Sequence, residues 1–519
     1  MTPDQMTIAE VMTADPVTAL ASEPVSSAAA RMRDRRVGSV IVVDDRAAAR
    51  PTGILTERDL LRLAASAADP AAEKVGEWMT AAPEVIDPGA EVVDTLDRLR
   101  HRGFRHLPVV AAGELVGVVT MRDLMRVAQI GPRPGAPIEV PKGLKGVVVT
   151  ETSIGDVRGL EGFYHYRQYS AIELAEKRSF EDVWHLVFDS TLPDAADSAA
   201  FRADVAARRT LPPALLEALP GLVAAATPAD GPFEPLTVLR GALSAWGAGE
   251  GLRPTLDIDA ARLRQDALTV AAVVPVLLAA ILRLHDDLEP IDPRPDLGHA
   301  ANWLWMLTGR EPSPADARAV EQYLISTIDH GFNASTFTAR VVAGTGADLG
   351  ACVVAAVGAL SGPLHGGAPS RALDALDEIG TPDAVEAWVR PRVEAGDKVM
   401  GFGHAVYRTV DPRAVLLHRV AEGLGGELVD LAAAVERRIE EVLAEVKPGR
   451  ELRANVEYWA GVVMELAGLP RLAFTPTFTV SRAVGWCAHV MEQASDNKII
   501  RPSARYVGPQ PPQPVPPPG

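Results

Sequence analysis

The chain of 519 residues has little cysteine, and its most apolar run is short. Its two cysteines, Cys352 and Cys487, allow one disulfide pair at most and form no metal-ligand spacing. We therefore expect no metal site and a reducing, cytoplasmic location. The most apolar run, 268–282, contains Pro275 and is shorter than the roughly 20 residues that a membrane span needs. It predicts a buried core helix, and we expect no membrane partner.

Positive charge is also in deficit, and the N-terminus lacks a targeting pattern. Lys plus Arg number 51 against 68 Asp plus Glu, a net charge of −17. Such an acidic surface repels nucleic acid and anionic lipid, so any anionic ligand must meet a local cluster of Arg and Lys. The opening MTPDQMTIAEVM has no basic region followed by an apolar core, so we expect no signal peptide. The length predicts two or three domains.

The N-terminal quarter of the chain repeats itself. In each copy we predict a short strand, an amphipathic helix, two β-branched strands joined by a turn, and a closing helix. The first copy has the longer hairpin loop, DDRAAARPTG. The aligned pairs are IAEVMTADPVTA (8–19) with VGEWMTAAPEVI (75–86), RRVGSVIVVDD (35–45) with HRGFRHLPVVAA (101–112), and GILTERDLLRLA (53–64) with GVVTMRDLMRVA (117–128).

These segments resemble a tandem pair of CBS domains, at about 7–65 and 74–128 within residues 1–129. The resemblance implies an adenine nucleotide effector in clefts between the copies, with Asp on the ribose and Thr near the phosphates. A helix N-terminus also favours phosphate, because its free N–H groups and the helix dipole attract an anion. Alternatively, these side chains only cap helices and the pair is a packing or dimerisation module. The residues concerned are Thr56 and Asp59 in the first copy and Thr120 and Asp123 in the second.

The rest of the chain divides by composition into three parts. Residues 130–143 are rich in Pro and Gly and predict a linker. Residues 144–507 are rich in Ala, Leu and Val at helical spacing, as in RSFEDVWHLVFDSTLP, and predict a mainly helical region. Residues 508–519 form a Pro-rich tail that we expect to be extended or disordered.

Three histidines and one glutamate in the helical region have unusual surroundings. His330 lies in TIDHGFNASTFTAR, His365 in SGPLHGGAPSRAL and His404 in KVMGFGHAVYRTVDPRA. Flanking glycines let a ligand approach the backbone closely, whereas a lone histidine is more often structural. Glu457 stands among apolar residues in RANVEYWAGVVMEL, where burial would raise the pKa of its carboxyl and suit it to proton abstraction.

These segments resemble citrate synthase, including its 2-methylcitrate synthase relatives, over about 144–507. So do GLKGVVVTETSIGDVRGLEGFYHYRQYSAIELAE at its start, IDPRPDLGHAANWLWMLTG (291–309) and FTVSRAVGWCAHVMEQASDNKIIRPSARYVG (478–508). The resemblance implies a multidomain fold, in which an α/β CBS pair precedes a mainly α-helical domain. That domain would have large and small subdomains, and we expect the small one, about 368–475, to close over the substrates.

The resemblance also implies the reaction, in which acetyl-CoA or propionyl-CoA condenses with oxaloacetate without a tightly bound cofactor. His365 would donate to the thioester oxygen, with its pKa lowered by a helix N-terminus, His404 would polarise the ketone, and Glu457 would be the base. The substrate-binding residues would be His330, Arg413, Arg482 and Arg501, and the CoA-binding residues Arg408, Lys398 and Lys447, with Arg450 a weaker candidate. Arg501 would reach the partner subunit's site, which predicts a homodimer or a larger homo-oligomer.

Two positions depart from the family pattern. Asn455-Val456-Glu457 stands where the family has Asn-Val-Asp, and the extra methylene moves the carboxylate by about 1 Å, which can cost about 100-fold in rate unless the backbone compensates. Gly331 stands where an acidic residue is common. Three hypotheses remain: an active citrate or 2-methylcitrate synthase regulated by nucleotide, another acyl-CoA condensing or cleaving enzyme, and a catalytically impaired nucleotide sensor.

Overall fold

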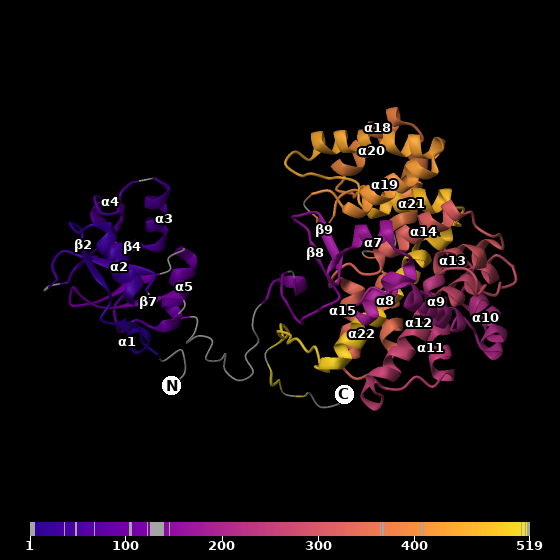
Figure 1. The fold of residues 1–519 in the computed structure, drawn as a ribbon, viewed down its shortest axis with the longest axis horizontal. Coiled ribbons are helices and arrows are strands. Elements are labelled where there is room, and N and C mark those ends of the chain that lie inside the picture. The colour runs from indigo at the N-terminus through magenta and orange to yellow at the C-terminus, as the bar shows by residue number, and fades with distance from the viewer. Residues whose placement is uncertain are drawn as a thin grey trace. The chain divides into compact units, whose positions relative to one another are not determined.

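The computed structural model describes residues 6–515 except positions 36, 47–48, 67, 103–105, 122, 125–139, 145, 364, 366–367, 405, 408, 510 and 514. It divides into two compact units, Met1–Val147 with Ser503–Gly519, and Val148–Pro502 (Figure 1). Most of the predicted linker 130–143 and half of the tail 508–519 lie outside the described residues. The predicted fold class, an α/β repeat followed by a mainly helical region, is confirmed.

In the first unit, each copy of the repeat completes the sheet of the other. Strand β5 (Thr80–Ala81), from the second copy, pairs antiparallel with β4 (Pro51–Thr56) of the first. Strand β1 (Thr13–Ala14) pairs in the same way with β7 (Glu114–Thr120). Backbone hydrogen bonds therefore join the two copies in both sheets. The other α-helices and strands described in this unit are α1 (Ile8–Val11), β2 (Thr18–Leu20), α2 (Val25–Arg35), β3 (Ser39–Val43), α3 (Glu57–Ala65), α4 (Val75–Trp78), α5 (Val92–Arg102) and β6 (His106–Ala111).

The repeated Met-Thr and Gly positions account for this exchange. Met79 of the second copy packs on Gly53 of the first, and Met12 of the first packs on Gly117 of the second. A Cβ at either glycine would collide with the methionine sulfur, so a larger residue would displace the methionine side chain. The sequence repeat is thus also a packing repeat.

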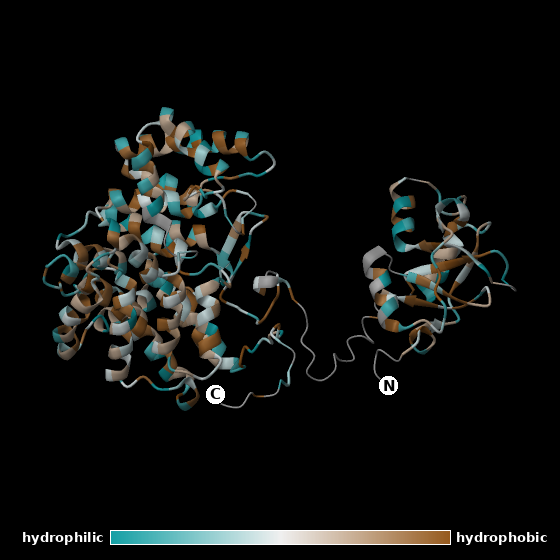
Figure 2. Cartoon of the chain, turned by 180° about the vertical axis from the view of Figure 1, so that it is seen from behind, coloured by the Kyte–Doolittle hydropathy of each residue, from teal (hydrophilic) through white to brown (hydrophobic). Residues whose placement is uncertain are grey.

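The second unit is built around two long helices, α12 (Ala260–His285) and α22 (Phe474–Asp496), which pack against each other. Helix α12 is long and apolar enough to cross a membrane, but 83% of its most apolar window is buried inside the unit. The prediction of a buried core helix over 268–282 is confirmed. Figure 2 shows the helices of this unit with hydrophobic and hydrophilic residues interleaved along them, as expected of amphipathic packing.

The second unit also contains the following strands and α-helices among its described residues. They are β8 (Gly155–Arg158), β9 (Phe163–Tyr166), β10 (Tyr169–Ser170), α7 (Ala171–Lys177), α8 (Phe180–Asp189), α9 (Ala195–Ala207), α10 (Pro213–Ala226), α11 (Pro235–Gly249), α13 (His299–Thr308), α14 (Pro314–Thr327), α15 (Ala334–Ala343), α16 (Leu349–Leu360), α17 (Ala368–Ile379), α18 (Val385–Glu394), α19 (Pro412–Leu424), α20 (Glu427–Val446) and α21 (Val456–Leu466).

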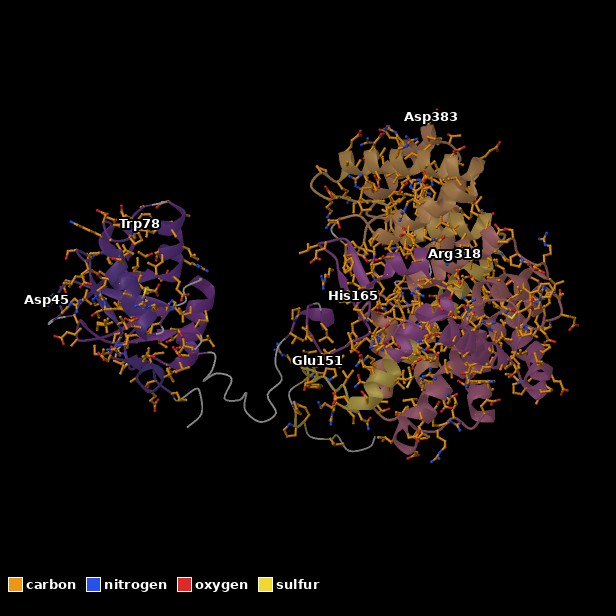
Figure 3. All side chains as sticks on the ribbon, in the orientation of Figure 1. Asp45, Trp78, Glu151, His165, Arg318 and Asp383 are labelled. Carbon is orange, nitrogen blue, oxygen red and sulfur yellow. The ribbon has the colours of Figure 1, made fainter. Side chains whose placement is uncertain are left out.

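Helices α17 to α21 form a layer of their own on one side of this unit. Helix α18 packs on α20, while α17 and α19 pack on α21. Figure 1 shows α18 and α20 outermost, and Figure 3 places Asp383 at the outer end of the layer. This layer lies within the segment 368–475, for which a mobile small subdomain was expected. Its movement stays a prediction.

Candidate active site

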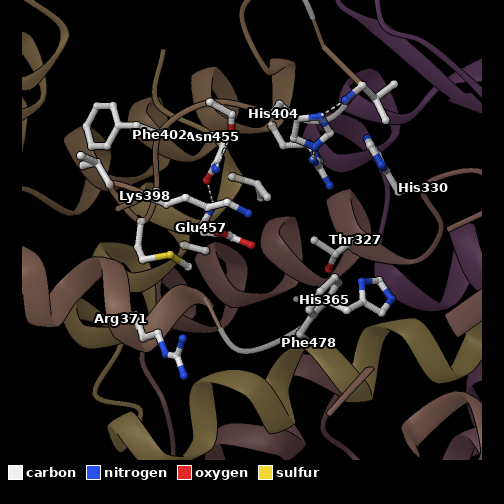
Figure 4. A pocket seen from close by; sticks show the side chains of 18 of the residues that line it. Thr327, His330, His365, Arg371, Lys398, Phe402, His404, Asn455, Glu457 and Phe478 are labelled. Atoms are coloured by element: carbon white, nitrogen blue, oxygen red, sulfur yellow. Dashed lines mark hydrogen bonds between the residues drawn. The ribbon is translucent and has the colours of Figure 1, made fainter. Parts of the chain in front are cut away.

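A cavity of about 1200 Å³ lies in the second unit between the α17–α21 layer and the helices around α22 (Figure 4). It collects residues that are far apart in the sequence, from β8 to α22. Seven of the residues singled out in the sequence line it: His330, His365, Lys398, His404, Arg413, Glu457 and Arg482. Three of these seven are cations, three are histidines and one is a carboxylate, inside a protein of net charge −17. The lining also contains the carboxylates of Asp156, Asp374, Glu378 and Asp397.

Two glycines bring the His404 loop against the start of α21. Gly401 and Gly403 have φ of +84° and +81°, in the left-handed region that favours glycine. The Gly401 carbonyl accepts from Asn455 N at 2.8 Å, and Gly403 N donates to the Arg453 carbonyl at 2.8 Å. Asn455 Nδ2 also donates to the Gly403 carbonyl at 2.9 Å. These bonds place His404 and Glu457 on the same cavity although about 50 residues separate them.

Glu457 lies in the first turn of α21. Asn455 caps this helix, and its Oδ1 accepts from Glu457 N at 2.9 Å. The helix N-terminus and the nearby Arg413 both favour a charged carboxylate. Burial outweighs them, with a smaller contribution from the negative charge of Asp411, and raises the pKa of Glu457 from 4.5 to about 7. Figure 4 shows its carboxylate directed into the cavity. The direction of the pKa shift is the one expected from the sequence, and the role of Glu457 as a base stays a prediction.

His404 has a defined tautomer. Its Nδ1 accepts hydrogen bonds from Val406 N at 2.9 Å and Tyr407 N at 3.1 Å, so the neutral ring carries its proton on Nε2. Burial, helped by Arg413, lowers the pKa of His404 to about 4 and keeps the ring neutral. Nε2 lies 3.2 Å from Arg413 Nη2. Two donors this close do not bond to each other, but one oxygen acceptor from a ligand can take both.

His365 has the opposite tautomer. Ser335 N donates to its Nε2 at 3.3 Å, and Ser335 Oγ lies 2.9 Å from the same atom. Nδ1 therefore carries the proton of the neutral ring. Burial, followed by Arg482, lowers the pKa of His365 to about 4. From the sequence we predicted a lowered pKa for His365, with a helix N-terminus as the cause. The dominant cause is burial.

Ser335 was not predicted from the sequence. Its side chain is completely buried and also accepts from Trp486 Nε1 at 3.1 Å. A serine near the start of a helix ordinarily indicates a cap, and nothing nearby in the sequence pointed to His365. Tyr407 was missed for a similar reason, because its hydroxyl lies 3.0 Å from His330 Nε2, on a distant segment.

His330 is held neutral beside two buried arginines. Burial, with Arg413, His404 and Arg482 adding to it, lowers its pKa well below 6.5. Arg482 donates through Nε to the Thr327 carbonyl at 2.9 Å and lies over the Phe478 ring, 4.7 Å from its centre. The departure at Gly331 has a backbone cause: its φ is +62°, and a Cβ there would lie 3.2 Å from Val157 Cγ2. An acidic side chain would be strained at this position.

Three of the predicted cations that the structure describes, Lys447, Arg450 and Arg501, do not line this cavity. Arg408 lies outside the described residues. Lys447 follows the end of α20 and Arg501 is exposed beyond α22, and neither lines the cavity. Arg371 and Arg392 also line the cavity, and the sequence did not indicate them because they lie in no motif. The Arg392 guanidinium lies over the ring of Trp388, another lining residue, 3.9 Å from its centre.

In the first unit, the predicted nucleotide-binding residues form helix caps. Thr56 donates through N and Oγ1, both at 2.9 Å, to Asp59 Oδ2 at the start of α3. Thr120 donates to Asp123 Oδ2 at 3.1 and 2.6 Å. Both Thr–Asp pairs thus form the hydrogen bonds of a helix cap. Whether they also bind a nucleotide stays a prediction. Within the described part of the chain, no group of three or more His, Cys, Asp or Glu is placed to hold a metal ion.

Comparisons with known proteins agree with this organisation. The family model described as citrate synthase, C-terminal domain, matches residues 143–503, and the CBS domain model matches 8–66 and 75–129. The chain is 37% identical over 373 residues to a citrate synthase of Deinococcus radiodurans, covering 71% of this chain and 96% of that protein. It is 38% identical over 371 residues to a 2-methylcitrate synthase of Mycobacterium tuberculosis, covering 71% and 91%.

Solved structures show the same likeness. The citrate synthase of Thermotoga maritima aligns with a TM-score of 0.63 at 37% identity, covering 73% of this chain and 98% of that one. The citrate synthase of Thermoplasma acidophilum, solved as a ternary complex with carboxymethyl coenzyme A and oxaloacetate, aligns with a TM-score of 0.67 at 28% identity, covering 73% and 98%.

Proposed function

The chain belongs to the citrate synthase family and is an acyltransferase of the citrate synthase type with tandem CBS domains, and from this premise we propose its reaction and the roles of its cavity residues. The enzyme condenses acetyl-CoA or propionyl-CoA with oxaloacetate to give citrate or 2-methylcitrate and CoA. The observation that carries the proposal is the cavity that joins a carboxylate of pKa about 7 to two neutral histidines of opposite tautomer.

Glu457 begins the reaction as the general base. Its carboxylate removes a proton from the carbon next to the thioester, and His365 Nδ1–H donates to the thioester oxygen as the enol forms. A neutral imidazole suits this step because it can donate without already carrying a charge that burial disfavours. A base with a pKa of about 7 is ionised in part near neutrality and still basic enough to act.

Oxaloacetate occupies the other side of the cavity. Its ketone oxygen takes the hydrogen bonds of His404 Nε2–H and Arg413 Nη2, whose nitrogens lie 3.2 Å apart. Arg482, Arg413 and His330 hold its carboxylates. The enol carbon attacks the ketone carbon, the new alkoxide takes up a proton, and water then hydrolyses the thioester to release CoA. Lys398 of the same cavity contacts the CoA moiety.

Regulation by an adenine nucleotide at the CBS pair, through Thr56, Asp59, Thr120 and Asp123, is part of the proposal. It is supported by the match to the CBS domain model and by the repeated Thr and Asp positions. A ligand that binds one conformation of the enzyme better than another would change activity by shifting their populations. The active form is a cytoplasmic homodimer or larger homo-oligomer, with the exposed Arg501 completing the partner's site.

Release of free CoA thiol tests the condensation. Acetyl-CoA and propionyl-CoA are each supplied with oxaloacetate to the parent protein, to Glu457→Gln, and to the control Glu465→Gln on the same helix. We expect turnover by the parent and the control, with at least one acyl-CoA, and loss of turnover in Glu457→Gln. No turnover of either acyl-CoA by the parent would refute the proposed reaction. Parental turnover by Glu457→Gln would show that Glu457 is not the base.

Calorimetry tests the nucleotide site separately. AMP, ADP, ATP and S-adenosylmethionine are titrated into the full chain, and activity is then measured with and without any that bind. We expect heat from at least one of them and a change in turnover. The absence of heat from all four on folded protein would leave the CBS pair as a structural module.

A further inference from the structure

Asp411 is a buried carboxylate at the end of the His404 loop that does not line the cavity. Its side chain is 2% exposed and caps α19. It accepts three hydrogen bonds from Arg413: Oδ1 from N and Nε at 3.0 Å each, and Oδ2 from Nη2 at 2.9 Å. An N-cap needs only the first of these. The other two fix the plane of the guanidinium, because Nε and Nη2 form a two-pronged contact with the carboxylate.

A fourth hydrogen bond comes from another part of the chain. Asp411 Oδ2 also accepts from Val456 N at 3.1 Å. Val456 is the first residue of α21, and the next residue is Glu457. One carboxylate therefore contacts both the arginine beside His404 and the start of the helix that carries the base. If Asp411 moved, Arg413 and the start of α21 would both lose hydrogen bonds that hold them in place.

The charges of this group are also linked. Burial works to raise the pKa of Asp411, but contact with Arg413 holds it below its ordinary value, so the carboxylate stays charged. At Glu457, after burial itself, Arg413 lowers the pKa and Asp411 raises it. Asp411 thus offsets part of the effect of Arg413 on the base.

We propose that Asp411 is a positioning residue for the condensation, which orients Arg413 toward oxaloacetate and holds the first turn of α21 so that Glu457 keeps its place relative to the ketone. The inference rests on the roles proposed above for Arg413 and Glu457. Asp411 acts only through these two groups, since all four of its contacts are internal to the protein.

Val456→Pro removes the contact of Asp411 with the start of α21 (the link to α21) and keeps its contact with Arg413 (the link to Arg413). Proline lacks the N–H that Asp411 accepts, but it suits the first position of a helix, as Pro412 of α19 shows. The extended backbone of Asn455, with φ of −107° and ψ of 179°, is compatible with a following proline. We expect kcat to fall about 10-fold to 100-fold, because the base is displaced. The KM for oxaloacetate should change less than about threefold, because Arg413 stays anchored.

Two controls isolate the lost N–H. Val456→Ala removes the cavity-lining side chain and keeps the N–H, so its kcat is the baseline against which Val456→Pro is compared. Ala195→Pro places proline at the first position of α9, after the cap Asp194 and away from the cavity, and should leave both constants unchanged. Circular dichroism and thermal melting of each variant establish that it is folded.

Asp411→Asn tests both links together. The amide keeps the shape but presents an NH₂ to a donor, so we expect a lower kcat and a KM for oxaloacetate raised about 10-fold or more. Besides burial, the groups that shift the pKa of Glu457 are Arg413, Asp411 and the cap Asn455. Without the Asp411 charge, Arg413 is less compensated and the pKa of Glu457 falls. The acid limb of kcat/KM should then move to lower pH. The control is Asp259→Asn, which changes the cap of α12 away from the cavity.

Parental kcat in Val456→Pro would overturn the link to α21. An Asp411→Asn protein with an unchanged KM for oxaloacetate and an unshifted acid limb would make Asp411 a helix cap only. If Asp411→Asn does not fold, Val456→Pro alone decides. An inactive parent would refute the proposed reaction rather than this inference, and calorimetric titration of oxaloacetate into parent and Asp411→Asn would then test the Arg413 link directly.

Discussion

Replacing Glu457 with glutamine should abolish turnover and yet stabilise the protein. The pKa of Glu457 is raised from 4.5 to about 7, chiefly by burial. The folded state therefore binds a proton more tightly than the unfolded state does. This contribution to stability is fully present below pH 4.5 and is lost as the pH rises through 7. Glutamine does not ionise and so does not incur the loss.

The size of the effect follows from the shift. Each pKa unit corresponds to about 1.4 kcal/mol, so a shift of roughly 2.5 units makes Glu457→Gln more stable than the parent by about 3 kcal/mol at pH 8. Below about pH 5 the gain should shrink to under about 1 kcal/mol, because the parent carboxyl is then protonated in the folded state. In the parent, kcat/KM should fall about 10-fold from pH 8 to pH 6 as the base becomes protonated.

Urea unfolding of parent and Glu457→Gln at pH 5 and pH 8, with thiol release over the same range, measures both effects. The control Glu465→Gln, on the same helix, should show neither. A variant that is less stable than the parent at pH 8 would refute the claim that burial raises the pKa of Glu457. A flat profile of kcat/KM between pH 6 and pH 8 would refute it as well.

Three further predictions concern other parts of the chain. Ser335→Ala removes the hydroxyl beside His365 Nε2 and should lower kcat about 10-fold in steady-state assays, with little change in the KM for oxaloacetate; unchanged kcat would exclude a role for the hydroxyl. Lys398→Ala should raise the KM for acyl-CoA about 10-fold, whereas Lys447→Ala, off the cavity, should change it less than about twofold; equal effects would contradict this distinction. Asp123→Ala should weaken nucleotide binding in calorimetry, and an unchanged affinity would separate Asp123 from the nucleotide site.

Much of the fold could be predicted from the sequence because its signals are local. The aligned motifs predicted two copies of one α/β unit, and the apolar run 268–282 predicted a buried helix, as α12 is. The exchange of β1 and β5 between the copies was not predictable, since it depends on which edges come together after folding. A short Thr-Ala strand looks the same whichever sheet it completes.

The candidate site divides in the same way. Residue types and motifs singled out His365, His404 and Glu457, because glycine neighbours and an isolated carboxylate can be read along the chain. Ser335 and Asp411 could not be identified from the sequence, because each looks like an ordinary capping residue. Their contacts with His365 and Val456 form only in the folded chain.

The sequence by itself determined the family, the order of the domains and which groups can exchange protons. Tertiary structure alone decided the pKa of Glu457, the opposite tautomers of the two histidines and the convergence of Arg413 with His404. The physical reason is that side-chain chemistry is a local property. A pKa depends instead on the water removed and the charges brought near, and a tautomer on which donor faces each ring nitrogen. Both are set by segments that meet only in the folded chain.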